Sequence, residues 1–356
     1  MNYSDYIVRE INYKEWNSFI PGSIYTSLNQ SWEYGEGKVH AEDWDAKRLV
    51  IEKSNGKPIA LIQLLIRSLP LIGAIARVSR GPLIINHSYN IDKVEILDIF
   101  LKITKKYKWA MISILPELQY EHALNNKLKA IGLFSRDRVS YGSSLISISG
   151  DENKLLMSID GKWRNLLRKS IKMGVNVSRE DVNNHSVSRL ISEYNNFKNV
   201  KNFSGTSSEL LYELSKQLSD NWKFKIFSAT LSDSNDVLNT IGKVVVITHG
   251  NTTTYLIGYT NNIGRYNNAN YLLLWKAIID AKNEGCQFFD LGGLNQTTTK
   301  GVAHFKRGLK GKEYILQGEK LYTNYKIISI TFVWMESLYN KLSKQIKKFK
   351  GRVLIT

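Results

Sequence analysis

The sequence predicts a mixed α+β fold built from two similar halves, because one order of strands, helix and closing strand occurs twice along the chain. Its 356 residues exceed what one ordinary hydrophobic core supports, so two domains are expected. A composition of 43% hydrophobic and 23% charged residues with five prolines is that of a folded protein and excludes disordered and fibrous classes.

In the first half, a hairpin is followed by a third strand, a helix and a further strand. Asn55-Gly56 is a strong hairpin turn between two strand-like runs, and Pro116 ends the last apolar run. The helix is expected from its apolar periodicity. The predicted elements are strands at 47–53, 58–66, 75–79 and 110–115, with the helix at 94–107 before the last strand.

The second half repeats this order, with a turn predicted at 233–236. Thr206-Ser207-Ser208-Glu209 fits a capping box and predicts the start of a preceding helix. The predicted elements are strands at 223–231, 237–248, 252–258 and 287–291, with a helix at 271–283 before the last strand. We therefore predict a first domain at 1–149, completed by the segment 318–356, and a second domain at 150–317.

Antiparallel strands followed by a helix and a crossover strand form the order of the GNAT acyltransferase core. The expected fold is therefore two tandem GNAT-like domains, each a mixed twisted sheet flanked by helices. A chance match is the alternative, since meanders followed by a helix are common in α+β folds.

The charge of the chain is strongly positive. Forty-nine Lys and Arg against 32 Asp and Glu leave a net charge of +17 and a pI near 9.6. This excess favours polyanionic partners such as RNA, DNA, anionic lipid or phosphate-bearing metabolites, and a general solubility charge is the alternative. The single cysteine, Cys286, excludes an internal disulfide and a CxxC metal site, and is expected in the core.

The ends of the chain bear on its location. No basic segment followed by an apolar stretch opens the sequence, and no window holds 18 uninterrupted apolar residues, so a cytoplasmic location is expected. Near the C-terminus, apolar residues recur at steps of three or four, with lysines mostly on the other side. This basic amphipathic helix suits an anionic surface at the inner face of the membrane; docking on the first domain is the alternative.

Four short motifs stand in order between residues 250 and 310. They are Tyr255-Leu256-Ile257-Gly258-Tyr259, Asn268-Ala269-Asn270-Tyr271-Leu272-Leu273-Leu274-Trp275, Phe289-Asp290-Leu291-Gly292-Gly293 and Phe305-Lys306-Arg307-Gly308. A basic segment from Trp163 to Val175 and the run from Leu28 to Lys38 precede them. In order and spacing, the motifs resemble the Fem family of aminoacyl-tRNA-dependent transferases over roughly residues 25–320.

The resemblance implies an aminoacyltransferase that passes an amino acid from tRNA to an amine, usually on a peptidoglycan precursor. Attack on the ester carbonyl creates an oxyanion, which a fixed cation stabilises. Lys306 matches the functional lysine of the family, and Asp290 is predicted to orient the amine; a surface lysine and a turn cap are the alternatives. No cofactor and no metal are expected, because the donor itself is aminoacyl-tRNA.

The predicted substrate-binding residues gather around these motifs. Arg164, Arg168 and Lys172 are spaced to lie on one helix face, where like charges repel unless an anion meets them. Phosphates of a tRNA acceptor end or of a precursor diphosphate would serve, and a solvated face is the alternative. Gly292-Gly293 after a strand lets a ligand approach the backbone, and a plain tight turn is the alternative. The full set is Trp32, Lys38, Arg164, Arg168, Lys172, Tyr255, Tyr259, Asn270, Tyr271, Gly292, Gly293 and Phe305.

The sequence departs from the family pattern at the acceptor side. Leu115 stands where well-known members carry an acid, and Glu117 could replace it only with a shifted backbone. The clamp for the peptidoglycan nucleotide would fall near Thr206–Leu211, where Ser207 and Ser208 stand. The acceptor is therefore open between a peptide stem and a sugar amine or another nucleotide- or lipid-linked envelope intermediate.

Two other functions compete with this prediction. A CoA-dependent GNAT N-acyltransferase would use acyl-CoA to modify an amino sugar in polysaccharide synthesis, but the turn at 262–268 has one glycine and no pyrophosphate-binding pattern. A non-catalytic basic protein that binds RNA or membrane on a transferase scaffold is the third. Lys306 and Asp290 favour the enzyme.

Overall fold

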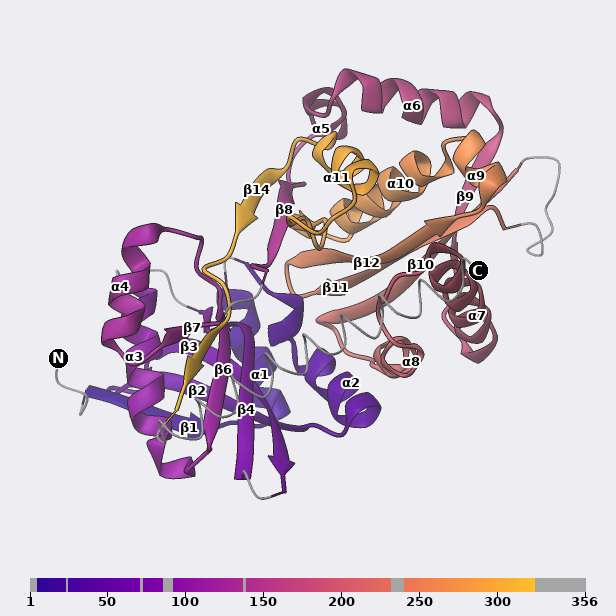
Figure 1. The fold of residues 1–356 in the computed structure, drawn as a ribbon. Helices are drawn as coiled ribbons and strands as arrows, with labels where there is room; N and C mark the ends of the chain where they lie inside the picture. Colours follow the sequence, from indigo (N-terminus) through magenta and orange to yellow (C-terminus); the bar gives the residue numbers. More distant parts are fainter. Residues whose placement is uncertain are drawn as a thin grey trace, which may run out of the picture.

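The computed structural model describes residues 5–23, 25–70, 73–85, 92–136, 139–231 and 240–323. In this part of the chain, two β-sheets with flanking helices lie one beyond the other (Figure 1). The chain builds most of the first sheet, then the second, and returns to the first at its last strand. The mixed α+β fold predicted from the repeated element order is confirmed.

The first sheet has the strand order β1-β2-β3-β4-β6-β15-β7, with β5 paired to β3. Only the β4–β6 pair is parallel among the described strands of this sheet, which is the crossover predicted from the sequence. Helix α3 (Lys93–Thr104), capped by Asp92, packs on this sheet through Phe100 and other apolar residues. The strands are β1 (Tyr6–Glu10), β2 (Asp45–Lys53), β3 (Pro58–Leu69), β4 (Gly73–Gly81), β5 (Leu83–Ile84), β6 (Met111–Pro116), β7 (Phe134–Ser135) and β15 (Lys320–Tyr322).

The second sheet has the order β14-β8-β13-β12-β11-β10-β9. Its strands β12 and β13 pair in parallel only at Thr252–Thr254 and Phe288–Asp290, so they are not paired beyond Asp290. The strands are β8 (Gly142–Ser147), β9 (Val175–Glu180), β10 (Trp222–Leu231), β11 (Gly242–His249), β12 (Thr252–Thr260), β13 (Phe288–Asp290) and β14 (Lys312–Ile315).

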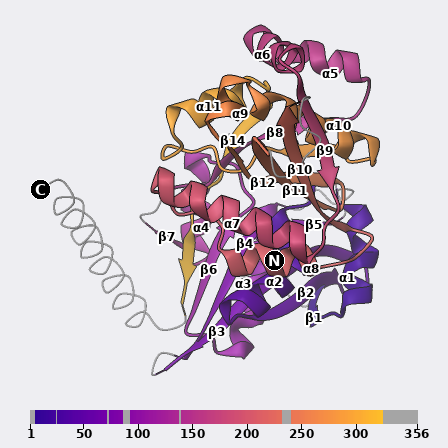
Figure 2. The ribbon, with the colours of Figure 1, turned by 90° about the vertical axis from the view of Figure 1, so that its right-hand side faces the viewer.

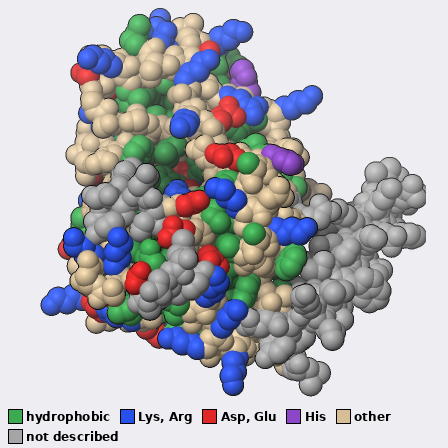
Figure 3. All heavy atoms as spheres, turned by 90° about the vertical axis from the view of Figure 1, so that its left-hand side faces the viewer, with side chains coloured by type: hydrophobic (Ala, Val, Ile, Leu, Met, Phe, Trp, Pro, Cys, Tyr) green, Lys and Arg blue, Asp and Glu red, His purple; other side chains and the backbone are tan. Residues whose placement is uncertain are grey.

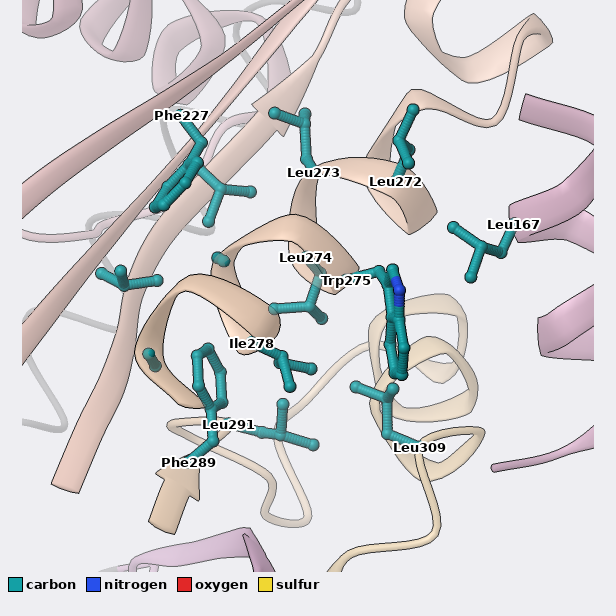
Figure 4. Close-up of a cluster of buried hydrophobic side chains, with 14 of the residues drawn as sticks. Leu167, Phe227, Leu272, Leu273, Leu274, Trp275, Ile278, Phe289, Leu291 and Leu309 are labelled. Carbon is teal, nitrogen blue, oxygen red and sulfur yellow. The ribbon is translucent and has the colours of Figure 1, made fainter. Parts of the chain in front are cut away.

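Helix α10 (Ala269–Asn283) forms the core of the second half. Its buried side chains share one cluster with Phe227 and Phe289 of the sheet, and Trp275 lies on the other side of the helix next to Leu309 (Figure 4). Burial of these large apolar side chains holds the helix on the sheet. The remaining helices here are α5 (Glu152–Ser158), α6 (Gly161–Lys172), α7 (Asn184–Lys201), α8 (Ser208–Lys216), α9 (Asn262–Tyr266) and α11 (Lys300–Arg307).

The two halves share buried surface. Helix α2 (Trp32–Glu42) of the first half lies beside α8 of the second (Figure 2). A Cβ atom on Gly37 would lie 2.6 Å from the Leu214 side chain, so the helices approach closely. Leu28 also belongs to the buried cluster that contains Leu210 and Val245. The remaining helices of the first half are α1 (Tyr13–Phe19) and α4 (His122–Ala130).

Most predicted element positions agree with the structure within a few residues; one cap differs, and two predicted elements are not described. The cap of α8 is Ser207, whose side chain accepts from the Leu210 amide, so the predicted box starting at Thr206 is wrong by one residue. The predicted turn at 233–236 lies outside the described residues. So does the predicted C-terminal helix, because the described residues end at 323.

The boundaries between the two sheets along the chain differ from the predicted domain boundary near residue 149. Strand β8 belongs to the second sheet, although the predicted first domain extends to residue 149. Strand β15 pairs with β6 of the first sheet (Figure 1). The division into two domains stays a prediction, and its boundary near residue 149 runs past a strand of the second sheet. No helix among the described residues has the length and hydrophobicity needed to cross a bilayer.

Candidate active site

Lys306 is a buried lysine at the point where β12 and β13 stop pairing. It lies on α11 with 7% of its surface exposed, and its Nζ donates to the Gly293 carbonyl at 2.9 Å. The ammonium also lies 5.3 Å from the centre of the Tyr255 ring. Burial lowers the pKa of Lys306 to about 8, against the opposing charge of Asp290. The predicted cation is therefore held inside the molecule.

Gly292 makes the turn under Lys306. Its φ of 66° lies in the left-handed region, and an added Cβ would lie 2.7 Å from the Tyr255 carbonyl oxygen. Only glycine fits there without strain. The two glycines predicted from sequence thus bring the backbone against Tyr255 and present the Gly293 carbonyl to Lys306.

Asp290 is fully buried at the end of β13. One carboxylate oxygen accepts from the Gly292 amide at 2.9 Å and from the Ser143 hydroxyl, and the other from Tyr25 at 2.8 Å and Tyr314 at 3.0 Å. Burial opposes its charge, but Arg80 and these hydrogen bonds outweigh burial and lower the pKa of Asp290. A carboxylate without exposed surface does not meet a substrate amine, so the predicted orienting role is not supported. It fixes the turn instead.

Arg80 is the cation that faces Asp290, and no motif in the sequence points to it. It lies near the end of β4 with 2% exposed surface, and Nη1 donates to Asp290 at 3.1 Å. Nη2 also donates to the hydroxyls of Tyr25 at 2.6 Å and Tyr314 at 2.7 Å. The one signal that could have found it is an arginine directly before the Gly81-Pro82 pair that closes the strand.

Glu117 does not take the place of the acid that is missing at Leu115. Its two oxygens accept from Nε and Nη2 of Arg80 at 2.9 and 3.0 Å. Both carboxylate oxygens of Glu117 are thus engaged by Arg80, and protonation of Glu117 would break this ion pair. In this structure Glu117 supports Arg80.

An aromatic cluster with a basic hollow lies on the other side of α11. Trp163 stacks on Phe305, and Tyr271 meets both rings edge-on. The Trp163 indole donates to the Phe305 carbonyl at 3.1 Å. A hollow of about 170 Å³ adjoins the cluster, lined by Asp160, Lys162, Trp163, Leu166, Tyr271, His304, Arg307, Gly308 and Lys310.

The predicted basic stripe on α6 is only partly available to an anion. Arg164 is half-buried, and its Nη1 donates to the carbonyls of Met157 at 2.6 Å and Ile159 at 3.0 Å, where α5 ends. This contact uses Nη1 of Arg164, and its predicted role in phosphate binding stays a prediction. Arg168 and Lys172 are exposed as predicted. On the face shown in Figure 3, Lys and Arg side chains are spread out with acids between them rather than gathered in one patch.

Four other predicted residues have their own contacts. Trp32 packs under the Arg48 guanidinium at 3.9 Å, and Lys38 pairs with Glu42. Tyr259 donates to Glu193 at 2.6 Å, on the side of the sheet that α7 covers. Asn270 is half-buried in the first turn of α10. None of the contacts found among described residues joins these four side chains to Lys306.

Residues 183–323 match the model of the FemAB family. The prediction made from the motifs is thereby confirmed, and the matched segment includes both Asp290 and Lys306. No curated protein matches the sequence.

Solved structures extend the likeness over almost the whole chain. The crystal structure of FemX has a TM-score of 0.76 at 17% identity, covering 92% of this chain and all of that one. L-PGS from Bacillus licheniformis has a TM-score of 0.52 at 11% identity, and the match covers 92% of this chain and 97% of that one. A conserved protein of unknown function from Bacteroides thetaiotaomicron VPI-5482 has a TM-score of 0.55 at 10% identity, and the match covers 88% of this chain and 98% of that one. At these identities the likeness establishes the fold.

Proposed function

We propose that this protein is an acyltransferase that moves an amino acid from aminoacyl-tRNA to an amine on a cell-envelope precursor. The observation that carries the proposal is the Lys306 ammonium, buried where β12 and β13 stop pairing and turned toward the Gly293 carbonyl. The match of residues 183–323 to the FemAB family model supports the transferase class. The acceptor is proposed to be a peptidoglycan or surface-polysaccharide intermediate.

The reaction depends more on a hydrogen-bond donor to the oxyanion than on a general base. The acceptor amine attacks the ester carbonyl carbon, a C–N bond forms, and the carbonyl oxygen becomes an oxyanion. The ester C–O bond then breaks, and the amine proton goes to the departing ribose oxygen. An ammonium has three N–H groups, of which Lys306 uses one on Gly293, so others can be given to the oxyanion.

The basic side chains around the aromatic hollow are proposed to meet the phosphates of the donor. Lys162 and Lys310 line the hollow, and Arg168 and Lys172 are exposed on the adjoining helix. A tRNA end presents several phosphates to such a surface, so its binding should depend steeply on salt. Acyl-CoA makes few ionic contacts, and its binding should vary much less.

Reversal of Arg168 and Lys172 to Glu is expected to weaken tRNA binding by about tenfold or more at low salt. Loss of two phosphate contacts should reduce the slope of log K against log salt by roughly 1.4–1.8. The measurement is titration of labelled tRNA, and separately of acetyl-CoA, at several salt concentrations. Lys127→Glu with Lys129→Glu on α4 changes the net charge equally and should leave the slope unchanged. Saturable acetyl-CoA binding without RNA binding would support the CoA alternative.

Transfer activity is expected to fall as pH rises through about 8. The oxyanion donor must be protonated, and Lys306 with a pKa of about 8 loses its proton above that value, so kcat/KM should drop about tenfold per further pH unit. The assay follows label leaving tRNA charged with a mixture of radioactive amino acids, in the presence of UDP-linked envelope precursors. Lys306→Arg stays charged, so its residual activity should show no such decline. A flat native profile up to pH about 9.5 contradicts the assignment.

No cofactor and no metal enter the proposed reaction. A cytoplasmic location, with the basic C-terminal helix at the membrane surface, is part of the same proposal and rests on the sequence alone.

A further inference from the structure

Arg80 combines two unfavourable features, a left-handed backbone conformation and a buried charge. Its φ of 54° is in the left-handed region, which a side chain of this size rarely adopts, and its guanidinium is almost fully buried. A buried charge needs partners on all its donors. Arg80 has them: Glu117 on one side, Asp290 on the other, and three tyrosine hydroxyls, with the Tyr141 oxygen at 3.3 Å.

These partners come from both sheets. Arg80 and Glu117 stand at the neighbouring ends of the parallel strands β4 and β6 of the first sheet. Asp290 ends β13, Tyr314 lies on β14, and Tyr141 directly precedes β8, all in the second sheet. The Arg80 cluster, as we call this group together with Tyr25, is thus a polar connection between the two halves.

The charges of the cluster balance only when Lys306 is included. Arg80 stands against two carboxylates, those of Glu117 and Asp290, which leaves one negative charge. Asp290 acts electrostatically on the buried Lys306 ammonium, and this supplies the second cation. Asp290 thus contacts Arg80 directly, and its charge raises the pKa of Lys306 without a direct contact between them in the described structure.

A chain of hydrogen bonds carries the position of Arg80 to Lys306. Tyr25 and Tyr314 each accept from Arg80 and donate to Asp290, which fixes one carboxylate oxygen. The other oxygen holds the Gly292 amide, and Ser143 bonds both Asp290 and the Gly292 carbonyl. The next carbonyl, that of Gly293, holds the Lys306 ammonium.

We propose that Arg80 is a positioning residue for Lys306, acting from the first sheet through Asp290 and the Gly292-Gly293 turn. The inference rests on the proposed function, because Lys306 is the group that it positions. It makes the two halves one catalytic unit: the second half carries the lysine, and the first half sets where its ammonium points.

The test is a double-mutant cycle of Arg80→Met and Lys306→Met in the transfer assay. Arg80→Met is expected to lower kcat by about 10- to 100-fold and to leave the KM for charged tRNA within about threefold. The double variant should match Lys306→Met within about twofold, because residues that act through one group are not additive. Arg136→Met removes another buried arginine of the first half, paired with Glu319, and should keep full activity.

Tyr25→Phe keeps the test decisive if Arg80→Met does not fold. It removes one hydroxyl from the cluster and should lower kcat about 3- to 10-fold, an effect that disappears in the Lys306→Met background. Tyr6→Phe, which removes a tyrosine–Glu95 hydrogen bond, is its matched control and should be neutral.

The outcomes separate the inference from the proposed function. Full activity of folded Arg80→Met, or losses that multiply in the double variant while Lys306→Met alone is impaired, would overturn the role of Arg80 only. Normal turnover of folded Lys306→Met would overturn the role of Lys306, and with it that of Arg80.

Discussion

Replacement of Lys306 by alanine is expected to lower the transfer rate by about 10²–10³-fold, since one oxyanion donor typically contributes about 3–4 kcal/mol to barrier lowering. Water should not readily replace the missing ammonium, because the Gly292-Gly293 turn and the Tyr255 ring surround its position. The rate is measured under single-turnover conditions with saturating charged tRNA, so that a change in donor affinity does not enter.

Lys312→Ala is the matched control for this variant. Lys312 is an exposed lysine on β14, a short way further along the chain, and its removal should leave the rate unchanged. Circular dichroism and thermal unfolding establish that both variants are folded. Equal rates for Lys306→Ala and Lys312→Ala in folded protein would remove Lys306 from the mechanism.

Asp290→Asn is expected to destabilise the protein by about 3–5 kcal/mol at pH 7. The change leaves the buried Arg80 guanidinium with Glu117 as its remaining carboxylate partner. The NH2 group of the new amide also replaces an oxygen that accepted hydrogen bonds. The free energy of unfolding is measured by urea denaturation of the native protein and the variant. Lys216→Met breaks an exposed ion pair with Glu213 and should cost less than about 1 kcal/mol.

The same comparison has a definite pH dependence. The pKa of Asp290 is lowered in the folded protein, so its carboxylate contributes stability above its ordinary pKa of 3.8 and loses that contribution as pH falls through the folded value. The difference between native protein and Asp290→Asn should therefore shrink in acid. A difference of under about 1 kcal/mol at pH 7 would contradict the importance of the buried pair.

The sequence was sufficient for features determined by neighbouring residues. Asn55-Gly56 specifies the β2–β3 hairpin, and the period of apolar residues specifies α3. The order of short motifs led to Lys306 and to the two glycines beneath it. In each of these cases, the contacts that matter lie within a few positions or within one motif.

What the sequence could not provide are contacts between distant positions. Arg80 and Asp290 are 210 positions apart, and each alone is an ordinary charged residue at the end of a strand. Arg164 has the spacing of a basic stripe, yet whether it reaches a phosphate or the end of α5 depends on how α5 and α6 meet. The motif order also pointed to Asp290, but the burial that argues against its predicted role depends on side chains from separate segments.

The late return of the chain to the first sheet has a consequence for synthesis on the ribosome. Strand β15 at 320–322 lies between β6 and β7, and among the described strands β7 pairs with the sheet through β15 alone. While the second half is being made, the nascent first half therefore keeps β6 as an open edge, which can pair wrongly with other strands. A released fragment that ends before residue 320 should therefore bind chaperones better than one that ends a few residues beyond 322, although the two differ little in composition.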